Sequence, residues 1–143
     1  MKAETLPDSH ADLLENPNFA HLATVRPDGS PQTNVMWFGW DGQRVRFTHA
    51  TTRQKFRNLS HERRVSMSIA DPTNPYRYLE VRGEVESIVP DDENTSFFRD
   101  LKARYGRDDE PIVDADVRIV ITVRPTLFIP FDGRMTEADR GWR

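Results

Sequence analysis

The sequence contains no cysteine among its 143 residues. This absence excludes a disulfide framework, a thiolate zinc site, an iron–sulfur cluster and a cysteine nucleophile. Histidine is sparse too, and the 4 histidines, at positions 10, 21, 49 and 61, lack metal-binding spacings such as HxH or HExxH. We therefore expect no metal site.

Long hydrophobic runs and a strong excess of one charge are absent as well. The longest apolar runs, Met36–Trp40 and Ile119–Val123, are strand-sized and far shorter than a membrane span. The formal net charge of -3 gives no overall basic field that would draw the chain to nucleic acid or an anionic membrane. Neither a GxSxG elbow nor a glycine-rich phosphate loop is present. These features predict a cytoplasmic protein with no nucleic-acid or membrane partner.

The sequence does contain a series of short β-like segments joined by turns. Asp-Gly pairs at positions 28–29 and 41–42 lie between such segments and indicate antiparallel hairpins. Gly83 interrupts a long segment, which indicates a bulge, and the prolines of residues 71–75 predict a loop. The predicted strands are Phe19–Arg26, Gln32–Trp40, Arg44–His49, Arg64–Ala70, Tyr78–Val89, Val117–Val123 and Thr126–Phe131.

Three helical segments separate some of these strands. Helices are predicted at Asp8–Glu15, at Thr51–His61 with Thr51 or Thr52 as its cap, and at Asp91–Tyr105. Antiparallel strands with two or three short helices predict an α+β fold, with six or seven strands closing into a barrel. We expect one domain over residues 1–143, in which the polar residues 132–143 form a flexible tail.

The segment Thr51–Leu59 leaves a predicted strand and enters a helix with three cations near its start. Arg53, Lys55 and Arg57 are unfavourable there, because the helix macrodipole favours cations at the opposite end. A phosphate would offset this, since the free N–H groups of a first helical turn bind anions. Arg53 and Arg57 share one helix face, whereas Lys55 points elsewhere. A solvated basic helix without a ligand remains the simpler alternative.

Three segments make the chain similar to a known family. Residues 23–32 resemble the opening hairpin of the pyridoxamine 5'-phosphate oxidase-like proteins, and residues 53–59 with 63–66 resemble their phosphate-binding strand–helix segment. Residues 76–85 are similar to the long strand of the branch that uses the deazaflavin cofactor F420. The resemblance runs from about residue 13 to residue 131. It implies a split β-barrel homodimer with its cofactor in a groove at the interface.

The resemblance also implies cofactor-binding roles for three groups of residues. The phosphate group comprises Lys55 and Asn58, flanked by Arg53, Arg57, Thr48 and Thr51. The strand beneath the cofactor ring contributes Gln32, Asn34 and Trp37. The partner subunit contributes Tyr76, Arg77 and Tyr78. A core role for Trp37 and a strand-capping role for Asn34 are the simpler alternatives.

These assignments lead to an F420-dependent reductase as the first hypothesis. The resemblance implies hydride transfer from reduced F420 to electron-poor double bonds conjugated to a carbonyl, and Arg77 and Arg82 are expected to meet the cofactor's glutamate tail. An FMN-dependent oxidoreductase stays open because a phosphate cradle serves either cofactor. A non-catalytic flavin- or F420-binding protein stays open because no acid–base residue stands out. Tyr76, Tyr78 and solvent are all candidates for the proton donor.

Overall fold

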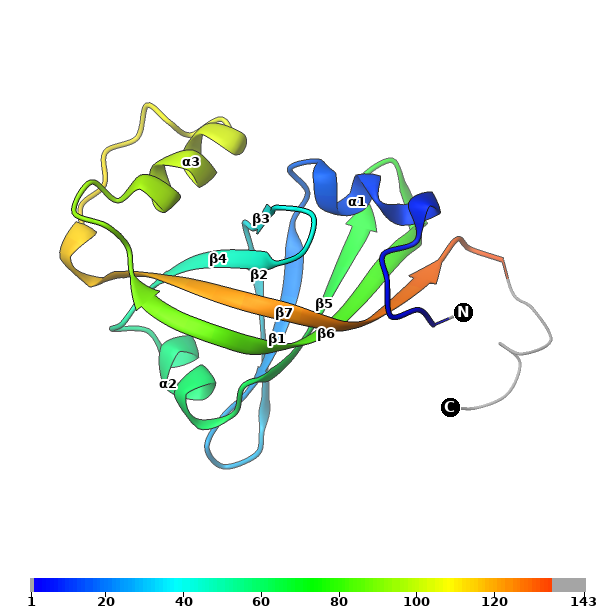
Figure 1. Ribbon diagram of the computed structural model, residues 1–143, viewed down its shortest axis with the longest axis horizontal. Coiled ribbons are helices and arrows are strands. Elements are labelled where there is room, and N and C mark those ends of the chain that lie inside the picture. The colour runs from blue at the N-terminus through cyan, green and yellow to red at the C-terminus, as the bar shows by residue number, and fades with distance from the viewer. Residues whose placement is uncertain (1, 135–143) are drawn as a thin grey trace.

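A computed structural model describes residues 2–134, which contain seven strands and three α-helices. The strands form one antiparallel sheet in the order β2-β1-β5-β6-β7-β4-β3, and this sheet curls into a half-barrel (Figure 1). The strands are β1 (Ala20–Val25), β2 (Pro31–Met36), β3 (Gly39–Trp40), β4 (Val45–Ala50), β5 (Arg64–Asp71), β6 (Asn74–Pro90) and β7 (Arg118–Phe131). The helices are α1 (Asp12–Glu15), α2 (Gln54–His61) and α3 (Ser96–Arg104), with short 3-10 turns η1 (Asp8–His10) and η2 (Ala115–Val117). The predicted α+β split barrel is confirmed.

Alternation along the strands places the core inside the curl of the sheet. On β5, Val65, Met67 and Ile69 are buried, as the two-residue period of a strand requires. Phe38 and Phe47 are the largest fully buried side chains. Leu59 of α2 reaches the same core. Burial of one face of α2 therefore fixes the helix against the sheet.

Gly83 marks the predicted bulge in the long pair of β6 and β7. The pairing shifts register between Arg82 and Gly83, and Gly83 lies opposite Pro125. Proline has no N–H to donate, and bulges are among the few places in a sheet that accept it. The two strands expected on either side of residues 124–125 are therefore one continuous strand, β7. The expected loop at residues 71–75 is a tight turn, with β6 beginning at residue 74.

Two further element boundaries differ from the prediction. The expected strand 32–40 is divided into β2 and β3 around Trp37 and Phe38. α3 begins at Ser96, because Asp91 and Asp92 accept hydrogen bonds from backbone N–H groups at the helix start. Residue 53 is the N-cap of α2, so neither predicted threonine caps that helix. The expected tail lies mostly outside the described residues, at 135–143.

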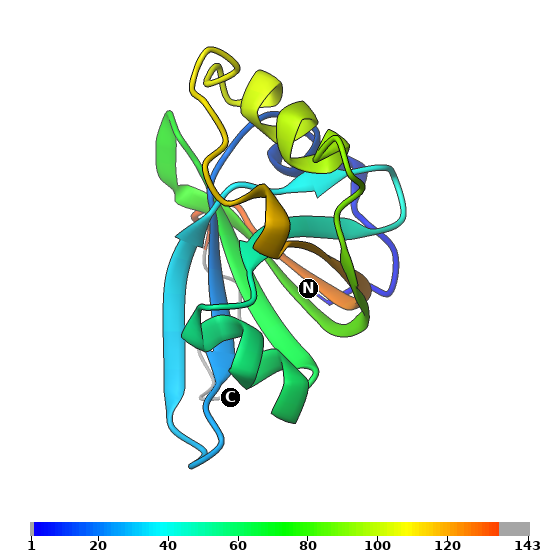
Figure 2. The same ribbon diagram turned by 90° about the vertical axis from the view of Figure 1, so that its left-hand side faces the viewer.

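Two of the α-helices and one 3-10 turn lie at one end of the sheet (Figure 1). α3, η2 and α2 lie on the same side, with η2 between the two helices (Figures 1 and 2). α2 also lies beside the β1–β2 hairpin, which turns at Gly29 with a φ of 87° (Figure 2). Within residues 2–134, no helix is long and apolar enough to cross a membrane.

Candidate functional site

Lys55, in the first turn of α2, points into the protein. Only 3% of the residue is exposed, and its Nζ lies 3.0 Å from the sulfur of Met36. Burial, and then the charge of Arg53, lower the pKa of Lys55 to about 8. The alternative of a solvated basic helix is therefore wrong for Lys55, although Arg57 is exposed. A buried cation beside a weak thioether acceptor is an incomplete arrangement that an anion would complete.

Asn58 joins α2 to two strands through its side-chain amide. The residue is fully buried, and its Nδ2 donates to Thr24 Oγ1 at 3.1 Å and to Gln32 Oε1 at 3.0 Å. Its Oδ1 accepts from Gln54 Nε2 at 3.0 Å, and Gln32 Nε2 donates to Asn34 Oδ1 at 3.1 Å. The structure thus brings together three predicted site residues, Gln32, Asn34 and Asn58. Because the amide of Asn58 is engaged within the chain, it is suited to positioning α2.

An open apolar pocket of about 250 Å³ lies between β2, β4 and α3. Trp37 forms one wall and stacks on Tyr105 with ring centroids 5.1 Å apart. Thr48 is 7% exposed, and its Oγ1 is the one buried side-chain polar atom without a hydrogen-bond partner among the described residues. A buried hydroxyl without a partner is costly, so Thr48 Oγ1 is available to hydrogen-bond a ligand in this pocket. The pocket is lined by Val35, Met36, Trp37, Thr48, Phe98 and Arg118.

A smaller polar pocket of about 160 Å³ adjoins the apolar one at Arg118. His49 lines it, and burial followed by the charges of Lys55, Arg53 and Arg118 lowers the pKa of His49 to about 4. Burial is the largest cause of this shift, and the three cations add to it because they disfavour a further positive charge in the pocket. The two pockets together therefore fit a ligand with a flat apolar ring and an anionic group, as in a flavin-type cofactor. The polar pocket is lined by His49, Ala50, Thr52, Arg53, Asp114 and Arg118.

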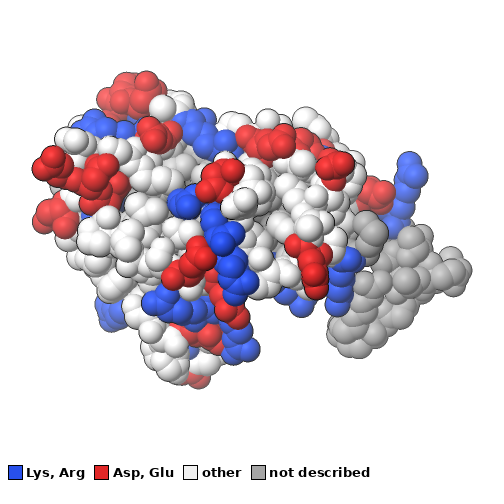
Figure 3. All heavy atoms as spheres, viewed as in Figure 1, with Lys and Arg blue, Asp and Glu red and all other residues white. Residues whose placement is uncertain are grey.

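The charged side chains on one face of the described part of the chain are mixed in sign. On the face shown in Figure 3, Lys and Arg side chains are interspersed with Asp and Glu. No group of three or more histidine or carboxylate side chains among residues 2–134 has a geometry that would hold a metal ion. Thr51 is exposed, and its backbone N–H donates to the carbonyl of Val117.

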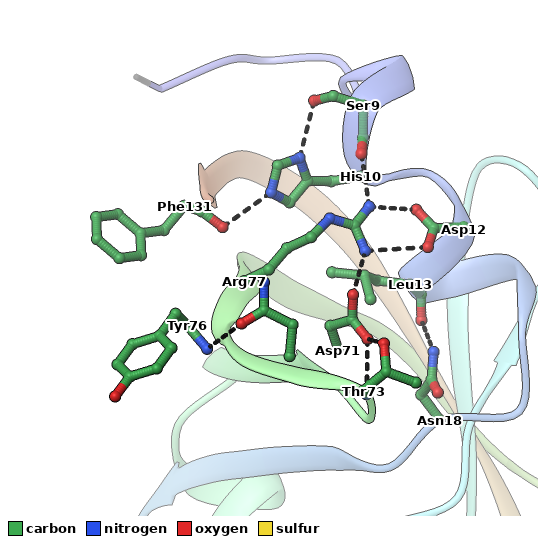
Figure 4. A network of polar contacts seen from close by, with 11 residues as sticks. Ser9, His10, Asp12, Leu13, Asn18, Asp71, Thr73, Tyr76, Arg77 and Phe131 are labelled. Atoms are coloured by element: carbon green, nitrogen blue, oxygen red, sulfur yellow. Dashed lines mark hydrogen bonds and ion pairs between the residues drawn. The ribbon is translucent and has the colours of Figure 1, made fainter. Parts of the chain in front are cut away.

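The segment expected from a partner subunit lies at the opposite end of the chain's own sheet from α2 (Figure 1). There the guanidinium of Arg77 donates to Asp12, to Asp71 and to the carbonyl of Ser9, at 2.6–3.1 Å (Figure 4). Tyr76 is 73% exposed. Arg77 is thus already paired within its own chain, and any contact of Tyr76, Arg77 and Tyr78 with a cofactor requires a second copy.

Sequence reasoning missed several residues of the two pockets, among them His49, Phe98, Asp114 and Arg118. In this sequence the anion site is signalled by the basic cluster at residues 53–57. Arg118 stands more than fifty positions away from that cluster. Its place in the site comes from the pairing of β7 with β4, in which residue 118 lies opposite Ala50. No local pattern in the sequence shows this neighbourhood.

Comparisons with known proteins identify the family of the chain. A family model described as pyridoxamine 5'-phosphate oxidase matches residues 6–128, and the chain belongs to this family. A solved structure described as an F420 reductase is 52% identical, with a TM-score of 0.79, covering 87% of this chain and 98% of that one.

More distant solved structures share the fold alone. A conserved hypothetical protein from Mycobacterium tuberculosis is 24% identical, with a TM-score of 0.67, over 92% of this chain and 89% of its own. General Stress Protein 26 from Bacillus anthracis is 20% identical, with a TM-score of 0.64, over 87% of this chain and 92% of its own. No curated protein matches the sequence.

Proposed function

We propose that this protein is an F420-dependent oxidoreductase that passes a hydride from reduced deazaflavin to an electron-poor, conjugated double bond of a small organic substrate. Its family and its 52% identity to a structure described as an F420 reductase support an oxidoreductase or flavin-binding role. The observation that carries the proposal is the buried ammonium of Lys55, whose one hydrogen-bond acceptor among the described residues is a thioether, where a phosphate would satisfy it.

The residues present fit such a cofactor. Lys55 and Arg53 would hold its phosphate, with the unpartnered hydroxyl of Thr48 as a further donor. Trp37 and Met36 supply an apolar wall that orients a ring and excludes water. The bound cofactor supplies the hydride, whereas the chain supplies anchoring, orientation and electrostatics. No proton donor is assigned.

An FMN-dependent oxidoreductase is the second candidate, and one observation favours it. F420 carries a glutamate tail that FMN lacks, and the arginines expected to meet this tail are paired already. Arg77 is held by Asp12 and Asp71, and Arg82 donates to Glu80 at 2.7 Å. A phosphate cradle whose expected tail-binding residues, Arg77 and Arg82, are already paired serves FMN equally well.

We also propose that the active form is a homodimer. Val35 beside the apolar pocket is 60% exposed, and Phe19 at the start of the neighbouring strand is 51% exposed. Large apolar side chains beside a pocket are typical of a surface that a second subunit covers. Sedimentation velocity at micromolar protein should show a dimer, and a stable monomer would contradict this part of the proposal.

The experiment that tests the function is anaerobic turnover of reduced F420 with a cyclic conjugated ketone. We expect the absorbance of oxidised F420 to return only in the presence of the protein and the ketone. Tight F420 binding without turnover would support a non-catalytic binding protein instead. Affinities for F420 and FMN measured over a range of salt concentrations separate the two cofactors, since the longer anionic tail should make F420 binding the more salt-sensitive.

A further inference from the structure

Arg118 occupies the junction of the two pockets. It is the first residue of β7, directly after η2, and it lines both the apolar pocket and the polar pocket. Ala50, opposite it on β4, follows the two pocket residues Thr48 and His49. A ligand that fills both pockets must therefore pass this side chain.

The guanidinium of Arg118 is held in one orientation. Its Nε donates to Asp114 Oδ1 at 2.9 Å, and its Cζ lies 3.9 Å from the centroid of the Phe98 ring. The side chain is 19% exposed. Among the described residues, Nη1 and Nη2 donate to no acceptor. Because the guanidinium is held at its Nε edge, its Nη N–H groups can bind a second anion with little loss of rotamer entropy.

Cations outnumber carboxylates among the described residues that line the polar pocket. Thr48 Oγ1, in the same pocket, is buried without a partner. Burial, and after it the charges of Lys55, Arg53 and Arg118, lower the pKa of His49. Among the described residues that line the polar pocket, Asp114 is the one carboxylate, and its charge is already matched by Arg118 itself. One further negative group at this junction would complete the hydrogen bonding and reduce the charge repulsion.

We propose that Arg118 is an anion-binding residue at the junction of the two pockets. The free edge of its guanidinium and the neighbouring Thr48 hydroxyl bind the phosphate of a ligand, and the ring of that ligand lies in the apolar pocket. The inference rests on the proposed function in that it names a further residue of the same site. Asp114 and Phe98 are positioning residues in this arrangement, because they set the orientation of the guanidinium without contacting the ligand's phosphate.

The test compares ligands with and without a phosphate. The purified protein and its Arg118→Met variant are titrated with FMN and riboflavin, and with F420 and its phosphate-free deazaflavin chromophore. We expect Arg118→Met to weaken binding of the phosphate-bearing member of each pair about ten- to hundredfold, the effect of losing one charge-assisted contact. The phosphate-free member should keep its affinity within about twofold, a change that reflects packing alone.

Arg124→Met is the matched control, because Arg124 lies on the same strand and pairs with Glu84 on the exposed surface. It should leave all four affinities unchanged. An equal loss for both members of a pair would mean that Arg118 only holds α3 through Phe98, and would overturn the inference. Unchanged affinity for FMN and F420 would overturn it too. If Arg118→Met does not unfold cooperatively, the same four titrations are made with Arg118→Gln.

A titration with inorganic phosphate distinguishes failure of the proposed function from failure of the inference about Arg118. If wild-type protein binds neither F420 nor FMN, the proposed function is wrong. The NMR titration of His49 is then followed with and without phosphate. A His49 pKa that phosphate raises in wild type but not in Arg118→Met would still support Arg118 as an anion-binding residue, whereas the same response in both proteins would contradict it.

Discussion

The Nζ of Lys55 lies 3.0 Å from the thioether sulfur of Met36 and contacts no carboxylate among the described residues. This contact defines the site, because a protein does not bury a cation against a weak acceptor without cost. In the ligand-free protein this burial lowers the free energy of unfolding. A bound phosphate would pair with the ammonium, and this pairing would favour binding.

Lys55→Met should therefore raise the free energy of unfolding of the ligand-free protein at neutral pH. The shift of the lysine pKa from 10.5 to about 8 corresponds to roughly 3 kcal/mol, which is an upper bound for the gain. Urea titration measures it. Lys102→Met is the control, since Lys102 is equally buried but lies 3.8 Å from Glu110, and its loss should not stabilise the fold. A destabilised Lys55→Met protein would show that the lysine is a structural residue.

Wild type and Lys55→Met should differ in how the free energy of unfolding changes with pH. The folded-state pKa of Lys55, about 8, lies below the usual lysine value of 10.5, so the unfolded chain binds more protons between these values. The free energy of unfolding of wild type should therefore rise with pH, relative to Lys55→Met, from pH 8 to pH 10.5. Urea titrations at several pH values in this window measure the difference. A constant difference would mean that Lys55 is not perturbed.

Two buried threonines should respond to valine with opposite signs. Thr48 Oγ1 has no partner, so Thr48→Val should leave the ligand-free protein unchanged or stabilise it by about 1–2 kcal/mol. Thr24 Oγ1 accepts a hydrogen bond from Asn58 at 3.1 Å, so Thr24→Val should destabilise the fold by about 1–3 kcal/mol. Thermal and urea unfolding of both variants test this. Equal losses would show that the Thr48 hydroxyl is satisfied in the ligand-free protein.

Much of the fold could be predicted because its signals are local. The hairpin at residues 28–29 follows from an Asp-Gly pair, and Gly29 indeed has a positive φ. The bulge at Gly83 was readable, but its partner Pro125 was not, since strand pairing over forty residues leaves no local pattern. The sequence therefore predicts a break at Pro125, where the structure has one continuous strand.

The candidate site could be predicted only in part, for a similar reason. The basic segment identified Lys55, but its charge pattern gave no way to tell a buried lysine from a solvated one. The burial of Lys55 depends on Met36, which belongs to a different element. Arg118 reaches the site through the pairing of β7 with β4. Tertiary contacts between distant segments thus decide which cations gather and which, like Arg57, stay in solvent.

Gly83→Ala should destabilise the fold more than Gly39→Ala. A Cβ at residue 83 would lie 2.8 Å from Cγ1 of Val123 and 2.7 Å from the carbonyl oxygen of Arg124, and this backbone oxygen cannot move without shifting β7. We expect a loss of about 1–3 kcal/mol or more from this overpacking. At Gly39 the nearest atom, on Phe97, is 3.5 Å away, which is an ordinary contact. Urea titration of both variants measures the contrast, and equal stability would mean that the bulge adapts.

The central claim is that a buried cation in α2 anchors the phosphate of a deazaflavin cofactor. Fluorescence titration of F420 against wild type and Lys55→Met tests it most directly, with melting curves to confirm that both ligand-free proteins are folded. We predict that wild type binds F420 and that the variant binds it about ten- to hundredfold more weakly, although its fold is at least as stable. Equal affinity of the two proteins for F420 would contradict the claim.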